Sequence, residues 1–144
     1  MAILTSNCIT VYSLKGNTLG ILEKLDIDNF NILRIPKQDP RENWKNNNLI
    51  ILGTSTYYRS DETTPYMPEY LKQYEKELSQ LEGKDIVLFG SGRSEYELFC
   101  GALDYLHNLL KDKNNIKLVY KFEGYPRERQ KIEFKQLLEE IING

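Results

Sequence analysis

Short apolar runs alternate with helix-patterned segments along the chain, and this alternation restricts the possible folds more than any other feature. Leu49 to Gly53 (LIILG) is continuously apolar, as expected for a parallel strand covered by helices on both faces. Four further runs have strand character: Cys8 to Tyr12, Asn31 to Ile35, Asp85 to Gly90 and Ile116 to Phe122. The pattern predicts an α/β protein with five parallel strands.

The segments between these runs carry apolar residues at helical spacing. They predict helices over Leu19–Leu25, Met67–Leu81, Glu97–Leu110 and Pro126–Ile142. Residues 36–48, between the second and third strands, contain two prolines and an Asn run, which discourage a long helix. Whether this stretch forms a short helix stays open from the sequence.

The length of 144 residues matches one domain, and the sequence has no internal repeat, low-complexity segment or linker. We therefore expect a single doubly wound domain over residues 1–144. Such sheets bind ligands at the carboxyl ends of their strands, at the topological switch point. Nineteen basic against twenty-one acidic residues give a net charge of −2, without the basic excess that marks a nucleic-acid-binding protein.

Cysteine and histidine are too few for several kinds of site. The cysteines, Cys8 and Cys100, cannot build a disulfide framework or a structural zinc site, and both are expected to be small buried residues. The single histidine, His107, is expected at the surface, and no metal site is predicted. Met1 to Thr10 lacks a basic region followed by an apolar one, and no stretch is long enough to span a membrane. We expect a cytoplasmic protein.

Three polar loops follow the first, third and fourth strands and should meet at the switch point. They are Ser13 to Thr18 (SLKGNT), Thr54 to Asp61 and Gly90 to Tyr96. The first loop has hydroxyls at both ends, a glycine that permits close backbone approach, and a helix start directly after it, so it suits a phosphate. It matches neither the Walker A loop nor the dinucleotide fingerprint, and simple helix capping is the alternative interpretation.

The order and content of these loops resemble the three cofactor loops of the flavodoxins. The resemblance runs from Cys8 nearly to the C-terminus, and residues 90–104 (GSGRSEYELFCGALD) are its most specific part, similar to short-chain flavodoxins. It implies a flavodoxin-like three-layer sandwich with a five-stranded parallel sheet in the order 2-1-3-4-5 and helices on both faces. One crossover helix would be shortened or lost. It also implies flavin mononucleotide (FMN) as the cofactor.

By this resemblance, the first loop wraps the FMN phosphate, while Tyr57 and Tyr96 stack on the two faces of the flavin ring. Aromatic faces exclude water and so separate the two one-electron reduction steps. No catalytic residue is implied. The full set of implied cofactor contacts is Ser13, Leu14, Lys15, Gly16, Asn17, Thr18, Thr54, Ser55, Thr56, Tyr57, Tyr58, Arg59, Ser91, Gly92, Arg93, Tyr96, Phe99 and Cys100.

Several residues in these loops depart from the family pattern. Lys15 replaces a small residue in the phosphate loop, and it either pairs with the phosphate or extends into water. Tyr58 replaces a glycine whose peptide flips on reduction, and its Cβ should disfavour that flip. Arg59 and Arg93 replace aspartates near the flavin. Positive charge there favours reduction, so we predict a second reduction potential less negative than is typical of flavodoxins.

The resemblance implies an electron carrier rather than an enzyme, moving single electrons from a flavodoxin/ferredoxin reductase to an unidentified redox acceptor. A monomer without nucleic-acid or membrane partners is expected. One alternative is the flavodoxin-like activator of class Ib manganese ribonucleotide reductase, which the short crossovers favour and residues 90–104 oppose. A flavin-dependent NAD(P)H reductase and a flavin-free binding module are the other two. The reductase would need insertions that this chain lacks, and the binding module would be colourless.

Overall fold

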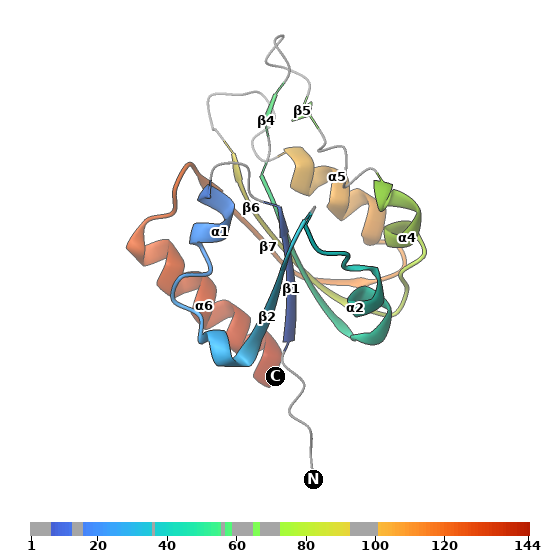
Figure 1. The fold of residues 1–144 in the computed structure, drawn as a ribbon, viewed down its shortest axis with the longest axis horizontal. Helices are drawn as coiled ribbons and strands as arrows, with labels where there is room; N and C mark the ends of the chain where they lie inside the picture. The colour runs from blue at the N-terminus through green and yellow to red at the C-terminus, as the bar shows by residue number, and fades with distance from the viewer. Residues whose placement is uncertain are drawn as a thin grey trace.

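A parallel sheet of five strands forms the centre of the protein (Figure 1). The structure is a computed structural model that describes residues 7–12, 16–35, 37–55, 57–58, 65–66, 73–92 and 101–144. The strand order is β2-β1-β3-β6-β7, which is the predicted order 2-1-3-4-5 counted along the main sheet. The strands are β1 (Asn7–Tyr12), β2 (Phe30–Arg34), β3 (Leu49–Thr54), β6 (Asp85–Gly92) and β7 (Asn115–Glu123).

Helices cover both faces of this sheet, as predicted. Figure 1 shows α1 and α6 on one side and α2, α4 and α5 on the other. Their bounds are α1 (Asn17–Gly20), α2 (Arg41–Asn46), α4 (Glu75–Ser79), α5 (Gly101–Leu110) and α6 (Glu128–Asn143), with a 3₁₀ turn η1 (Ile27–Asn29) before β2. The flavodoxin-like three-layer arrangement expected from the sequence is therefore confirmed.

The core consists of two apolar clusters, one on each face of the sheet. Alternate residues of a strand point to opposite faces, so Ile86 and Leu88 of β6 pack toward α5 while Val87 and Phe89 pack toward α6. All four side chains are fully buried. The continuous apolar runs in the sequence thus reflect strands that are covered on both faces.

The first helix begins earlier and ends earlier than predicted. The helix α1 spans Asn17–Gly20 instead of Leu19–Leu25. After it the backbone continues in tighter turns, because the N–H groups of Ile21, Leu22 and Glu23 each donate to the carbonyl three residues before them. Such bonds tighten the chain into 3₁₀-like geometry, which apolar spacing alone does not distinguish from an α-helix.

The crossover between β2 and β3 contains a short helix, so this element is shortened and not lost. Helix α2 has only six residues, and Asn47 follows it in extended conformation while its side chain donates to the Asn43 carbonyl. Trp44 anchors α2 to the sheet: its indole is buried, and Nε1–H donates to Thr10 Oγ1 at 3.1 Å. One aromatic residue therefore fixes a helix that is too short to be stable alone.

Two helices predicted from the sequence are only partly covered by the described residues. Of the predicted helix 67–81, residues 67–72 lie outside them, and the described part is helical over Glu75–Ser79. Residues 97–100 of the predicted helix 97–110 also lie outside them, and α5 covers the rest. The closing helix α6 begins at Glu128, after an extended Arg127.

A small antiparallel ribbon was missed by the sequence analysis. Tyr57–Tyr58 forms β4 and pairs with Pro65–Tyr66, which forms β5. We expected a polar loop from Thr54 to Asp61 and no strand there. Thr54, expected in that loop, is instead the last residue of β3. Two-residue strands carry no usable period, so only the contact between them reveals them.

The predictions for Cys8 and His107 concern burial. Cys8 is a buried free thiol, as expected, and burial raises its pKa. His107 on α5 is half-buried, whereas we expected it at the surface. Cys100 lies outside the described residues. Within the described ranges, no group of three or more metal-ligating side chains occurs, and no helix is long and apolar enough to cross a membrane.

Candidate functional site

Three buried hydroxyl groups meet at the carboxyl ends of the central strands. Thr18 Oγ1 lies 2.7 Å from Ser55 Oγ and 2.7 Å from Ser91 Oγ. The three residues are 0%, 7% and 5% exposed, respectively. We call Thr18, Ser55 and Ser91 the hydroxyl cluster. Each member comes from a different predicted loop region, so the structure brings the three regions together as the sequence analysis expected.

The hydrogen-bonding capacity of the hydroxyl cluster is not used up by its internal bonds. Each hydroxyl has one proton and two acceptor positions. The two contacts consume two of the three protons, whichever hydroxyl donates in each. One O–H therefore remains to donate to a further acceptor. A group rich in acceptor oxygens, such as a phosphate, suits this arrangement.

Close backbone packing joins the strand ends beneath this cluster. The Ser55 N–H donates to the Tyr12 carbonyl at 3.2 Å, which ties the end of β3 to the end of β1. A Cβ on Gly90 would lie 2.2 Å from the Thr54 carbonyl oxygen. Only glycine fits there, so Gly90 is needed for β6 to pass this close to β3.

Gly16 shapes the approach to α1. Its φ of +84° is in the left-handed region that favours glycine, and no atom of the described residues lies within 4 Å of the position a Cβ would occupy. Its carbonyl accepts the N–H of Gly20 at 3.0 Å. Gly16 is therefore required for its backbone conformation, while the space beside it is open.

One residue of this region was not singled out in the sequence. Gly124, directly after β7, has a φ of +58°, and its N–H donates to the Gly92 carbonyl at 3.1 Å. The turn between β7 and α6 therefore contacts the end of β6, where the third predicted loop begins. A glycine immediately after the last strand was the signal that could have found it.

The structure describes about half of the predicted cofactor contacts. Those at the carboxyl ends of the strands are Gly16, Asn17, Thr18, Thr54, Ser55, Ser91 and Gly92. Tyr57 and Tyr58 form β4, and only their backbone is described. The others lie outside the described residues, and their roles stay predictions: Ser13, Leu14, Lys15, Thr56, Arg59, Arg93, Tyr96, Phe99 and Cys100.

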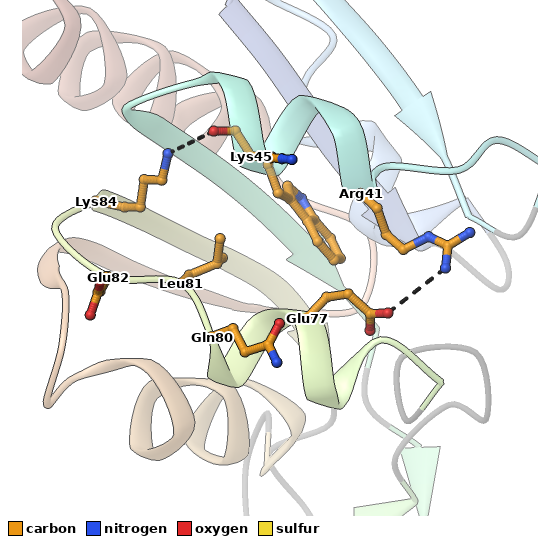
Figure 2. A pocket seen from close by; sticks show the side chains of 8 residues that line it. Arg41, Lys45, Glu77, Gln80, Leu81, Glu82 and Lys84 are labelled. Atoms are coloured by element: carbon orange, nitrogen blue, oxygen red, sulfur yellow. Dashed lines mark hydrogen bonds and ion pairs between the residues drawn. The ribbon is translucent and has the colours of Figure 1, made fainter.

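A separate cavity of about 450 Å³ lies between α2 and the segment from α4 to β6 (Figure 2). No predicted cofactor contact lines it. Three of its five charged side chains have partners: Lys84 Nζ donates to the carbonyls of Lys45 and Asn47, and Arg41 pairs with Asp39 and, at 3.8 Å, with Glu77. These contacts connect α2 to α4 and to the start of β6. We therefore attribute the cavity to the packing of the shortened crossover.

Comparisons with known proteins point to one family. The flavodoxin family model matches residues 20–135. "Probable flavodoxin 2" from Bacillus subtilis (strain 168) is 29% identical over 97 residues, which are 65% of this chain and 59% of that protein. A flavodoxin from Maridesulfovibrio salexigens is 30% identical over 87 residues, 58% of each chain. The matched segments thus span under two thirds of these curated relatives.

A solved structure supports the fold over nearly the whole chain. The flavodoxin of Streptococcus pneumoniae TIGR4 superposes with a TM-score of 0.78 at 21% identity, covering 96% of this chain and 99% of that one. At this identity the likeness concerns the fold alone. Because the family model covers most of the sequence, the membership rests on sequence and fold together: this chain belongs to the flavodoxin family, whose cofactor is FMN and whose members are electron carriers rather than enzymes.

Proposed function

We propose that this protein binds FMN at the carboxyl ends of β1, β3 and β6. We propose further that it passes single electrons from a flavodoxin/ferredoxin reductase to a redox acceptor protein. The observation that carries the proposal is the hydroxyl cluster, in which Thr18 of α1 bonds to Ser55, directly after β3, and to Ser91 of β6. The proposed contacts are those named for the three loops in the sequence analysis.

The described residues fit the phosphate of FMN. The hydroxyl cluster retains one O–H donor and contains no carboxylate that would repel an anion. Gly16 leaves open space beside α1, and Gly90 lets the strand ends approach closely. When bound, FMN supplies the one-electron chemistry, while the protein binds it, orients it and limits its contact with water.

Flavin binding can be tested on the purified protein. A visible absorption spectrum and a titration with FMN, followed by flavin fluorescence, should show binding with a clear end point. Failure of the wild-type protein to bind any flavin would overturn the proposal. A flavin-free binding module would give that negative result.

A pair of matched variants tests the position of the site. Thr18→Val removes the hydroxyl that joins the cluster and should weaken FMN binding about tenfold, the effect of losing a hydrogen bond to a charged group. Thr10→Val removes another buried threonine hydroxyl, the acceptor for Trp44 on the α2 side. It should lower stability and leave the FMN affinity unchanged. Equal effects of the two variants on affinity would contradict the proposed position.

The alternative functions make different predictions. Hydride acceptance directly from NADPH, without an added reductase, would indicate a flavin-dependent NAD(P)H reductase. Activation of a manganese ribonucleotide reductase would indicate the specialised activator. The comparisons favour neither alternative. We also propose a cytoplasmic location and a monomeric state; the free thiol of Cys8 is compatible with a reducing compartment, and sedimentation analysis tests the monomer.

A further inference from the structure

Lys131 on α6 is the one charged residue in the buried set of the described chain. Its side chain is only 4% exposed. The ammonium Nζ lies 2.9 Å from Glu23 Oε2, 3.2 Å from the Tyr125 hydroxyl and 3.3 Å from Glu128 Oε1. Its donation to Glu23 holds the pKa of Lys131 above the ordinary value. A buried ammonium is tolerated only where hydrogen-bonding partners surround it, so Lys131 and its three partners must keep these positions relative to one another.

The three partners use the whole donor capacity of Lys131. An ammonium has three N–H donors, and here they are directed to Glu23, Tyr125 and Glu128. Nζ also lies 4.6 Å from the centre of the Tyr125 ring, within the range of a cation–π contact. Lys131 therefore has no donor left for a ligand, and any effect on a ligand must act through these neighbours.

Two of those neighbours reach α1. Glu23 lies in the turns that follow α1, and the Tyr125 hydroxyl donates to the same Glu23 oxygen at 3.0 Å. The Tyr125 ring covers Gly20, the last residue of α1, so closely that a Cβ there would lie 2.6 Å from Cε2 of the ring. Lys131 is thus hydrogen-bonded to both residues that contact the end of α1.

Helix α1 depends on such contacts because it has only four residues and cannot be stable alone. Backbone bonds connect its two ends: Glu23 N–H donates to the Gly20 carbonyl, and Gly20 N–H donates to the Gly16 carbonyl. Thr18 lies within this turn and places its hydroxyl between Ser55 and Ser91. A shift at Gly20 and Glu23 should therefore move Gly16 and Thr18.

We propose that Lys131, acting through Glu23 and Tyr125, is a positioning residue for the phosphate-binding end of α1. This inference rests on the proposed FMN site. The turn that carries Tyr125 also bonds to the end of β6 through Gly124 and Gly92, so it connects two of the three loop regions. Lys131 fixes this turn against α1 and so sets where the phosphate-binding groups lie.

The test compares two flavins that differ in the phosphate. Dissociation constants for FMN and for riboflavin, which lacks the phosphate, are measured by fluorescence for the wild type and for Lys131→Met. The variant keeps an unbranched side chain that is one atom shorter and removes the charge. We expect FMN affinity to fall about tenfold and riboflavin affinity to change less than about twofold, because only the phosphate end is displaced. A general loss of structure would weaken both ligands equally.

Lys24→Met is the matched control. Lys24 pairs with Glu128 at 3.0 Å in the same group of charges, but its side chain is 38% exposed, and among the described residues it makes no hydrogen bond or ion pair with Glu23 or Tyr125. It should leave both affinities unchanged. An equal loss with Lys24→Met and Lys131→Met would show a general effect of charge and overturn the inference.

A second variant tests the contact between Tyr125 and α1 without changing Lys131. Gly20→Ala places a methyl group against the Tyr125 ring and should reproduce the selective loss of FMN affinity. The same substitution in a Tyr125→Ala background should have little further effect, because the ring is gone. An unchanged ratio of FMN to riboflavin affinity in both Lys131→Met and Gly20→Ala would overturn this inference and leave the proposed function standing. A wild-type protein that binds no FMN would overturn the proposed function and this inference with it.

Discussion

Thr18 makes hydrogen bonds to residues that are 37 and 73 positions away in the sequence. Each bond closes a long loop of chain, and both lie in a region with almost no access to water. The net value of a buried hydrogen bond is modest, but a buried hydroxyl left without a partner is costly. The hydroxyl cluster therefore stabilises the site mainly because all three members are present together.

Removing one member of the hydroxyl cluster should lower the free energy of unfolding by more than the net value of the hydrogen bonds that are lost. We predict that Thr18→Val destabilises the protein by about 1 to 3 kcal/mol, because Ser55 and Ser91 then lose their partner while remaining buried. The variant that also carries Ser55→Ala and Ser91→Ala should be less destabilised than the sum of the single changes. Urea unfolding measures both. Additive single changes would show that the three hydroxyls act independently.

Ionised side chains contribute to stability in a pH-dependent manner at the junction of α1 and α6. The hydrogen bond from Lys131, assisted by that from Tyr125, holds the pKa of Glu23 below its usual range. The pKa of Glu128 is lowered in the same direction, first by Lys24 and then by Lys131. A carboxyl with a depressed pKa stabilises the fold above its unfolded pKa of about 4.3, and this contribution is lost as the pH falls through the lower folded value.

We therefore predict that Glu23→Gln lowers stability at neutral pH and that the difference from wild type disappears as the pH falls below about 4. Urea unfolding at a series of pH values measures it. In a Lys131→Met background the pH-dependent difference should be much smaller, because the main partner of Glu23 is missing. A difference that persists at low pH would mean that Glu23 acts through packing rather than charge.

At the level of elements, an aromatic side chain of one central strand packs over a glycine of the next. Gly53 of β3 is paired in register with Phe89 of β6, and a Cβ on Gly53 would lie 2.2 Å from Cζ of the Phe89 ring. The same ring packs against Phe134 of α6 with 5.2 Å between ring centres. Gly53 thus makes room for the ring that connects two strands to a helix.

Gly53→Ala should accordingly destabilise the protein by about 3 kcal/mol, the upper end for overpacking a core, because the ring is fully buried and cannot turn into solvent. Thermal or urea unfolding checks the size of the loss. Combining it with Phe89→Leu should recover part of the stability, since the smaller side chain leaves room for the methyl group. If the double variant were no better than the sum of the single ones, the contact would not be the cause.

The elements also show how far the sequence can predict secondary structure. The strands of the main sheet were predicted to within two residues at each end, because short apolar runs between helix-patterned segments have a clear sequence signal. The length of α1 was not predicted, since the change to tighter turns after Gly20 leaves the apolar spacing intact. The ribbon of β4 and β5 was missed because two-residue strands are defined only by their pairing.

For the whole molecule, the proposed cofactor should act as a stabilising ligand. The proposed site joins regions that follow three strands of the sheet, so a ligand that contacts all of them favours the folded state. FMN at one hundred times its dissociation constant should add about 2.7 kcal/mol and raise the melting temperature on the order of 10 °C. Thermal unfolding with and without FMN measures this. Riboflavin at the same concentration should give a smaller shift, and equal shifts would argue against a phosphate site.

By itself, the sequence determined the class of fold, the order of its elements and the three loop regions of the candidate site. These follow from local patterns: apolar runs, helical spacing, and glycine and hydroxyl residues after strands. Only the tertiary structure decided that Thr18 meets Ser55 and Ser91, that Tyr125 covers Gly20, and that the ammonium of Lys131 is buried among Glu23, Tyr125 and Glu128. The physical reason is that these contacts join residues far apart in the chain, where pairing depends on side-chain shape and burial rather than on any local period.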